Sequence, residues 1–381
     1  MTSKNVKVCH FSSVHTTTDT RVFARECVGL AKHFTVTLIA IGNNSGLHQG
    51  VNVVAIPKPK SRVIRLMVTT FNVFFKALKV NASIYHIHDA EMIPFALIFS
   101  LMGKKVIYDV HENTYHDIRI KTWIPKPLKW ILGNSYRILE WLAAKSMHTI
   151  LVIAKPEFAK QFVTGNYTII QNFADVNFLK QYRVESRAAI KENTLFYIGT
   201  LYDTYYNIDK IVEAVYLLKK QGLIVHCKIA GYYGSMLASR TQKLVYFAEV
   251  KDQLEFLGYI SQEKGYQLSR QCKVGLCLKD QPEEILVSHE RKFFEYMAIG
   301  LPILCCDSII YKEVVGKLNL GLCADLQDAE AIANALKALF TQTDLDQLMQ
   351  NNIGAAENDY NWMKDEETLV GLYRGLVKNT K

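Results

Sequence analysis

The sequence lacks an apolar run long enough to cross a bilayer, and it lacks a recognisable secretory leader. Its longest apolar stretch, Met92–Met102, is about eleven residues, whereas a membrane-spanning helix needs roughly twenty. Met1–Lys7 leads straight into a strand-like run, without the basic start, apolar core and cleavage site of a signal peptide. We therefore expect a cytosolic chain that does not cross the membrane.

The sequence also lacks cysteine pairs with the spacing of a metal site. The eight cysteines show no spacing typical of a metal site. Most of them stand in apolar runs, where a free thiol behaves as a small buried hydrophobic group. No D-x-D metal motif stands out either, so we expect neither disulfides nor a bound metal. The cysteines that favour this interpretation are Cys9, Cys227, Cys277, Cys305 and Cys306.

Acidic residues are absent from a long part of the N-terminal half, since no Asp or Glu occurs between Cys27 and His88. The whole chain carries a net charge of +9, which favours anionic partners. Two stretches, Pro57–Val80 and Lys121–Trp141, mix basic with aromatic and aliphatic residues, as an anionic membrane interface requires. The alternative is that both are core helices with solvated lysines. No nucleic-acid motif accompanies the charge, so we expect no nucleic-acid partner.

The 381 residues suggest two domains at roughly 150 residues each. Apolar runs alternate with amphipathic stretches along the chain, and a polar segment near Gln171–Lys180 divides them into two series. This pattern predicts an α/β fold with two doubly wound, Rossmann-like domains. The expected strands are Val6–Phe11, Thr35–Ile41, Val51–Ile56, Ser83–His88, Lys105–Val110, Thr194–Ile198, Ile224–Ala230, Leu254–Phe256, Val274–Leu278 and Ile303–Cys306, and the expected helices include Arg21–His33, Glu91–Met102, Ile208–Lys220 and Gln327–Phe340.

Ligands of doubly wound sheets bind outside the carboxyl ends of the strands. Two such edges that face each other form a cleft, and clefts between domains are favoured ligand sites. Residues that directly follow a strand are therefore the first candidates for function.

The most informative segment is Ser288–Asp307, SHERKFFEYMAIGLPILCCD. Ser288 is a suitable N-cap, Gly300 suits the left-handed position after a helix, and Pro302 blocks continuation. We therefore predict a helix over about Glu290–Ile299. A helix that begins shortly after a strand offers free N–H groups and a positive dipole end to an anion.

Glu295 stands in an unusually apolar part of this helix. One interpretation is a helix charge that reaches solvent between apolar neighbours. The other is a carboxylate that accepts hydrogen bonds from the vicinal hydroxyls of a ribose. Lys292, one turn earlier on the same face, would then meet a phosphate.

The segment KFFEYMAIGLPIL resembles the signature of family 4 retaining glycosyltransferases of the GT-B fold, among them enzymes of bacterial surface-polysaccharide assembly. The resemblance implies that Glu295 binds the donor ribose and that the backbone around Ser288–Lys292 faces the diphosphate. It further implies retention at the anomeric carbon, a nucleotide-sugar donor as substrate and no metal or other cofactor. Domain limits of 1–172 (acceptor side), 173–358 (nucleotide-sugar side) and 359–381 (a helix that crosses back) follow from it.

Weaker resemblances extend over nearly the whole chain. The first loop and helix, SVHTTTDTRVF, are similar to those of the family, and two strand ends, HIHDAEMIP and VIYDVHE, resemble its acceptor side. A His at the place of His111 often contacts the donor sugar near the anomeric carbon, so His111 is the predicted catalytic residue. The other residues expected to line the acceptor side of the cleft are His15, Asp19, Arg21, His88, Asp89 and Glu112.

Two positions depart from the family pattern. A second Glu, common eight positions before Glu295, is replaced by Val287. The basic clamp that usually follows the glycine of YIG is missing, because Thr200–Asp209 after Gly199 contains no basic residue. The charge must then come from Arg291, Lys292 or Lys279.

These residues leave three functions open. The first is a glycosyltransferase that acts on a lipid-linked or polysaccharide acceptor, peripheral on the inner face of the membrane. The second is a nucleotide-sugar epimerase of the same architecture, and the third is a catalytically silent GT-B protein that binds a sugar nucleotide.

Overall fold

The computed structural model describes residues 6–110, 114–120, 124–147, 149–152, 167–171, 173–201, 206–280 and 289–378. The chain divides into two compact units. The N-terminal unit combines Met1–Asn172 with the last segment, Trp362–Lys381, and the C-terminal unit is Phe173–Asn361. Each unit is built on its own sheet, as the sequence predicts.

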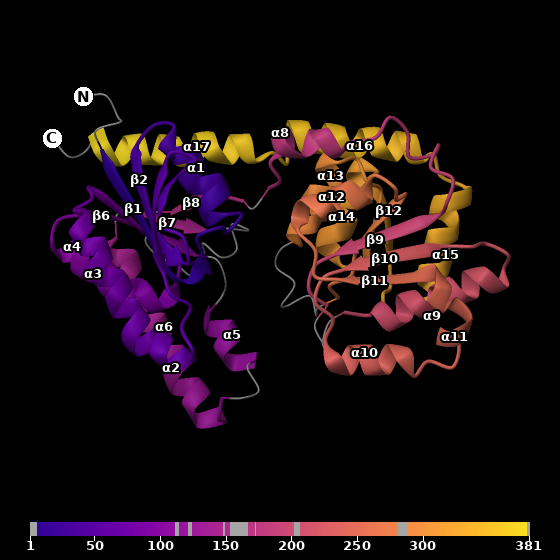
Figure 1. Cartoon of the computed structure of the whole chain (residues 1–381), viewed down its shortest axis with the longest axis horizontal. Helices are drawn as coiled ribbons and strands as arrows, with labels where there is room; N and C mark the ends of the chain where they lie inside the picture. Colours follow the sequence, from indigo (N-terminus) through magenta and orange to yellow (C-terminus); the bar gives the residue numbers. More distant parts are fainter. Residues whose placement is uncertain are drawn as a thin grey trace. The chain divides into compact units, whose positions relative to one another are not determined.

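The sheet of the N-terminal unit has the strand order β3-β4-β2-β1-β5-β6-β7-β8 (Figure 1). Its strands run parallel, apart from the antiparallel pair β3–β4. The strand order reverses between β1 and β5, which makes this the switch point of the sheet. The strands are β1 (Lys7–Thr16), β2 (Thr35–Ile41), β3 (Gly46–His48), β4 (Val51–Ile56), β5 (Ile84–Ile87), β6 (Lys105–Val110), β7 (Thr149–Val152) and β8 (Tyr167–Ile169).

Helices cover both faces of this sheet (Figure 1). On one face lie the π-helical turn η2 (Val22–Cys27), α1 (Val28–Ala31) and the final helix α17 (Trp362–Lys378). The other face carries α3 (Thr70–Val80), α4 (Ile93–Leu101) and α6 (Lys126–Ser146). The shorter elements are α2 (Arg62–Ile64), η3 (Arg65–Thr69), η4 (Ala90–Met92) and α5 (Thr114–Ile120).

The predicted helix Arg21–His33 is not a regular α-helix. Its first part is the π-helical turn η2, and α1 provides a single α-helical turn after it. Arg21, Arg25 and Glu26 are buried at or in this turn. Arg21 pairs with Glu26 beneath the helix, and burial of these charges against the sheet accounts for the departure from an amphipathic helix.

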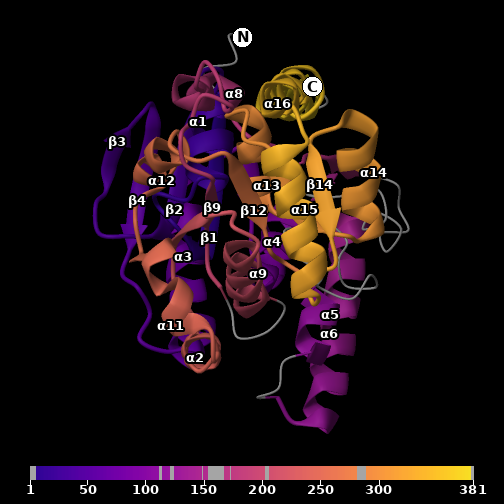
Figure 2. The same ribbon diagram turned by 90° about the vertical axis from the view of Figure 1, so that its right-hand side faces the viewer.

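The C-terminal sheet is parallel throughout, in the order β11-β10-β9-β12-β13-β14, and its switch point lies between β9 and β12. Helices α9 and α15 pack together on one face, and α13 with α16 on the other (Figures 1 and 2). The strands are β9 (Thr194–Ile198), β10 (His226–Ala230), β11 (Leu254–Gly258), β12 (Val274–Cys277), β13 (Ile303–Cys306) and β14 (Gly321–Ala324). The helices are α8 (Val176–Leu179), η5 (Lys180–Tyr182), α9 (Ile208–Lys220), α10 (Ser235–Gln242), α11 (Phe247–Val250), η6 (Lys251–Gln253), α12 (Gln262–Ser269), α13 (Arg291–Ala298), α14 (Ile309–Leu318), α15 (Ala329–Thr341) and α16 (Leu345–Asn358).

A buried arginine fixes the end of α13. The Arg187 guanidinium donates to the carbonyl oxygens of Ile299 and Gly300 at 3.0 Å each, and to those of Ser269 and Cys272 at 2.7 Å each. Burial lowers the pKa of Arg187 to about 10, which still leaves the side chain charged at neutral pH. Because a cation also compensates the negative end of a helix dipole, Arg187 holds α13 in place against the sheet.

The cysteines are free, and all but the half-buried Cys323 are buried. This confirms the prediction of buried thiols. Among the described residues, no helix combines the length and the hydrophobicity that a membrane crossing requires.

Candidate active site

Three glycines end neighbouring strands at the switch-point edge of the C-terminal sheet. Gly199, Gly231 and Gly258 follow or end β9, β10 and β11 with φ angles of 142°, 128° and 63°. The Gly199 amide donates to Ala230 O at 2.9 Å, and the Gly231 amide donates to Gly258 O at 2.7 Å. A Cβ atom on Gly231 would lie 1.9 Å from the Gly199 carbonyl oxygen. The edge is thus a closely packed backbone surface, of the kind that lets a ligand approach main-chain groups.

Helix α13 begins beside this edge. Its N-cap is Glu290, not Ser288 as predicted, and it has no side-chain cap. Its other end matches the prediction, because Gly300 takes a left-handed φ of 65° directly after the helix. The positive end of its dipole therefore points to the side where an anion could bind.

Lys292 reaches from α13 to the end of β9. A Cβ atom on Gly199 would lie 3.2 Å from both Cε and Nζ of Lys292. The ammonium donates to Glu290 Oε1 at 2.6 Å, and it stands 4.6 Å from the centre of the Tyr197 ring. Burial opposes the charge, but the Glu290 carboxylate raises the pKa of Lys292. A cation is therefore held at the glycine edge, although the segment after Gly199 contains no basic residue.

Glu295 is almost completely buried, at 4 % exposure. Its Oε1 accepts from Arg291 Nε at 2.9 Å, one helical turn earlier. The first interpretation drawn from the sequence is a helix charge that reaches solvent. The burial of Glu295 does not agree with that interpretation. Arg291 and Lys292 place two cations in the first turn of α13, where they suit an anionic ligand rather than the helix dipole itself.

The N-terminal unit carries a second polar group at its own switch-point edge. Asp89 follows β5, and its Oδ2 accepts from Ser12 Oγ at 2.8 Å and from the Ser13 amide at 2.6 Å. His15 Nδ1 lies 3.1 Å from Asp19 Oδ2, and Nε2 lies 3.8 Å from Asp89 Oδ1. Burial alone would lower the pKa of His15, but its contact with Asp19 and the charge of Asp89 raise it. The structure thus brings together His15, Asp19 and Asp89.

Arg21 and His88 lie deeper in the same unit. Arg21 Nη2 contacts both oxygens of Asp109 at 3.1 Å. His88 Nε2 lies 2.9 Å from His10 Nδ1, and its Nδ1 is 3.4 Å from Asp109 Oδ2. Asp19 caps η2 by accepting from the amides of Arg21 and Val22 at 2.8 Å each. Asp19 and Arg21 therefore cap and brace the start of η2.

Three predicted site residues, His111, Glu112 and Ser288, lie outside the described residues. Conversely, the sequence analysis overlooked Glu290, Tyr197, His10, His86 and Glu26. Glu290 carries a local signal, an acid at the start of a helix next to a lysine. Tyr197, His10 and His86 stand within apolar runs, and Glu26 lies within the predicted helix Arg21–His33 without a motif of its own.

The family comparison concerns the C-terminal unit. Residues 180–355 match the family model described as glycosyl transferases group 1. This segment is a group 1 glycosyl transferase domain. The match confirms the prediction that the chain is a glycosyltransferase enzyme. No curated protein matches the sequence.

Solved structures match over almost the whole chain. Sucrose-phosphate synthase from Thermosynechococcus elongatus has a TM-score of 0.74 at 15% identity and covers 99% of this chain and 100% of its own. Anabaena HepE in complex with UDP and glucose has a TM-score of 0.71 at 13% identity, with 97% and 100% covered. The α,α-trehalose 6-phosphate synthase from Burkholderia multivorans has a TM-score of 0.66 at 11% identity and covers all of both chains. At these identities the likeness establishes the fold, and it confirms the predicted pair of Rossmann-like sheets.

Proposed function

We propose that this glycosyltransferase takes a sugar from a nucleoside diphosphate sugar and passes it, with retention, to a lipid-linked or polysaccharide acceptor. The observation that carries the proposal is the position of Lys292, a half-buried ammonium beside Gly199 at the switch-point edge and at the start of α13. A fixed cation at the positive end of a helix dipole suits a diphosphate. Such a group stabilises the charge that develops on the leaving oxygen.

The residues that we propose to recognise the donor lie on α13. Glu295 is proposed to accept hydrogen bonds from the ribose hydroxyls, and Arg291, which now contacts it at 2.9 Å, is proposed to turn towards phosphate when the donor binds. A solved structure of similar fold, HepE, is a complex with UDP-glucose. Uridine nucleotides are therefore the first donors to test.

The missing basic clamp also bears on the choice among the three functions. The absence of a basic residue after Gly199 would suit a catalytically silent protein, but Lys292 supplies a cation at Gly199 and so favours an active enzyme. In the proposed mechanism the acceptor hydroxyl attacks from the leaving-group side, and the phosphate takes its proton. His111 is proposed to contact the sugar near the anomeric carbon.

Exposed apolar side chains on two segments of the N-terminal unit support a membrane-linked acceptor. Val63 and Met67 in α2 and η3 are 69% and 66% exposed, and Trp130 in α6 is 72% exposed. Exposed cations accompany them, among them Arg62, Lys79 and Lys126. Helices α3 and α6 also contribute buried residues to the core, among them Val73 and Tyr136, so these stretches have both buried and exposed apolar side chains. Scattered cations around exposed aromatic and aliphatic groups are typical of a surface that binds anionic lipid.

The experiment that tests the function is a turnover assay with a panel of nucleotide-sugars and a lipid extract as acceptor pool. Release of nucleoside diphosphate together with transfer of labelled sugar to lipid is the expected result. Conversion of one nucleotide-sugar into its epimer would instead identify an epimerase, and tight binding without turnover would identify a silent protein. The anomeric configuration of the product, measured by NMR, decides between retention and inversion.

A further inference from the structure

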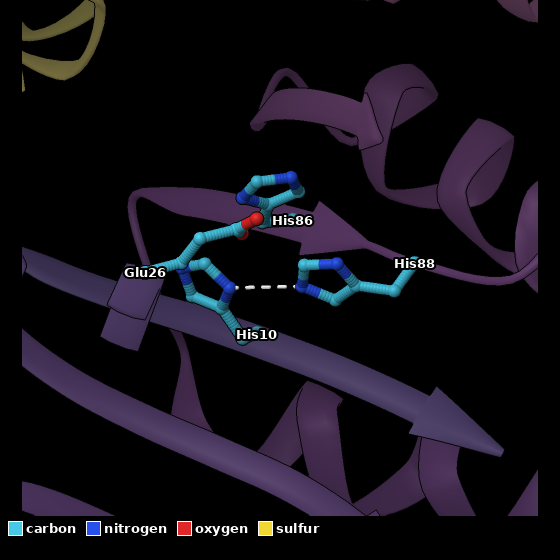
Figure 3. Close-up of side chains that lie close together, drawn as sticks. All are labelled: His10, Glu26, His86 and His88. Atoms are coloured by element: carbon cyan, nitrogen blue, oxygen red, sulfur yellow. Dashed lines mark hydrogen bonds between the residues drawn. The ribbon is translucent and has the colours of Figure 1, made fainter. Parts of the chain in front are cut away.

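Three histidines and one glutamate meet inside the N-terminal unit (Figure 3). His10 on β1 and His86 on β5 are direct partners in the parallel register of these strands. His88 follows β5 two residues later, and side chains two apart on a strand share a face. All three therefore point to the face that η2, α1 and α17 cover, and Glu26 reaches them from η2.

The spacing of these side chains suits a metal ion. One ligand atom from each of the four residues lies within 4.8 Å of the others, and all four residues are buried. His10 Nδ1 and His88 Nε2 are 2.9 Å apart. Four ligands at zinc bond lengths stand roughly 3.3 Å from one another in a tetrahedron, so small side-chain movements would suffice to hold the ion.

The outer contacts of the histidines also match a metal site. Histidines that bind a metal usually donate their second ring N–H to an oxygen, which fixes the ring and its tautomer. Here His10 Nε2 and His86 Nδ1 lie 3.1 Å and 2.7 Å from the Tyr373 hydroxyl. His88 Nδ1 lies 3.4 Å from Asp109 Oδ2. Each ring thus has one nitrogen on an outer oxygen and turns the other toward the cluster.

Glu26 supplies the observation that points to a cation. The residue is 0% exposed, and its carboxylate lies against His10 and His86 (Figure 3). Its Oε1 is 3.0 Å from Arg21 Nε, and its carboxyl group also interacts with the neighbouring buried carboxyl group of Asp109. The same guanidinium also pairs with Asp109. Two neighbouring buried carboxyl groups therefore share one guanidinium. Because ionising both is costly without further positive charge, a dication at the centre would balance them.

We propose that His10, His86, His88 and Glu26 bind one divalent transition-metal ion. Three imidazoles and one carboxylate favour Zn²⁺ over the hard cations Mg²⁺ and Ca²⁺. The four protein ligands complete a tetrahedron and leave no open position, so the ion has a structural role. It joins β1, β5 and η2, and through Tyr373 it also fastens α17. The sequence did not predict this site, because its ligands come from three separate segments without a local motif.

The test uses the full chain after dialysis against a chelator, with Zn²⁺ and, as a spectroscopic probe, Co²⁺. We expect about one equivalent of Zn²⁺ to bind and to raise the melting temperature. We also expect Co²⁺ to give the visible absorption bands of a four-coordinate ion. Glu26→Gln keeps the size of the side chain but removes its charge, and His86→Gln removes one ligand. Both variants are expected to lose at least roughly tenfold in zinc affinity.

Two further variants make the result decisive. Tyr373→Phe retains the packing of α17 and removes the outer oxygen of two ligands, so zinc affinity should fall roughly 10- to 100-fold in a folded protein. His48→Gln removes an exposed histidine of the same unit and should change nothing. Absence of a four-coordinate Co²⁺ spectrum would overturn the proposal and leave a hydrogen-bonded network only. Equal zinc affinity in wild type, Glu26→Gln and Tyr373→Phe would overturn it as well.

Discussion

Substitution of Glu295 by Gln probes the donor site with the smallest change of shape. The carboxylate is 4% exposed and accepts a hydrogen bond from Arg291 at 2.9 Å. Gln keeps the side-chain volume and one acceptor oxygen, but it removes the negative charge. Arg291 is partly exposed and can be solvated, so the free energy of unfolding should fall by less than about 1 kcal/mol.

The expected loss of donor affinity is larger. A hydrogen bond that involves a charged group contributes about 1.5–3 kcal/mol, and 1.4 kcal/mol corresponds to about a factor of ten. If Glu295 binds the ribose, Glu295→Gln should therefore weaken binding of a nucleoside diphosphate roughly 10- to 100-fold.

Calorimetric titration with UDP and with 2′-deoxy-UDP locates the contact. In the wild type the missing 2′-hydroxyl should cost a measurable part of the affinity, and in Glu295→Gln the difference between the two ligands should shrink. Glu255→Gln is the matched control, because it breaks a carboxylate–lysine pair of the same unit, with Lys228 at 2.8 Å. A folded Glu295→Gln protein that binds both ligands as the wild type does would refute the reasoning.

Three other predictions concern stability and the membrane. Arg187→Met leaves four carbonyl oxygens without their donor, so urea unfolding should show a loss of about 3–5 kcal/mol; a loss under about 1 kcal/mol would contradict the bracing of α13. Trp130→Ser should reduce flotation with anionic liposomes at low salt without changing the melting temperature, and equal recovery of the wild type with neutral and anionic vesicles would contradict an electrostatic interface. Burial raises the pKa of Glu140 to about 7. The folded state therefore binds the proton of the Glu140 carboxyl group more tightly than the unfolded chain does. The contribution of this carboxyl group to the free energy of unfolding falls as pH rises from about 4.5 to 7. Between pH 5.5 and 8 the wild type should lose about 2 kcal/mol relative to Glu140→Gln in urea unfolding, and parallel pH profiles would contradict this.

Strong local patterns allowed much of the fold to be predicted. The limits of β2, β4, β6, β9, β13 and α9 agree with the expected ranges. These segments combine a continuous apolar or amphipathic pattern with polar or glycine residues at both ends. The short or polar elements β3, β8, α10 and α12 carry no such pattern, since contacts with the rest of their unit determine them.

The candidate site residues also differ in whether a local sequence pattern could indicate them. Lys292 and Glu295 belong to one helix, so a local motif could indicate them, and the first is indeed held at Gly199. His10 and His86 are 76 residues apart in sequence, and only the register of β1 with β5 makes them neighbours. Both histidines stand within apolar runs, and a single histidine in a strand is ordinarily part of a core. The sequence therefore did not indicate that they could be metal ligands.

The most direct test of the donor site is the affinity of the full chain for nucleoside diphosphates, with and without the Lys292 ammonium. UDP, ADP and GDP are titrated into the wild type, into Lys292→Met and into the control Lys337→Met, which removes an exposed lysine of the same unit. We predict that one of these nucleotides binds the wild type and Lys337→Met equally, and that Lys292→Met binds it at least roughly tenfold more weakly. Binding of that nucleotide to Lys292→Met with the affinity of the wild type, or binding of none of the three to the wild type, would contradict the proposed donor site.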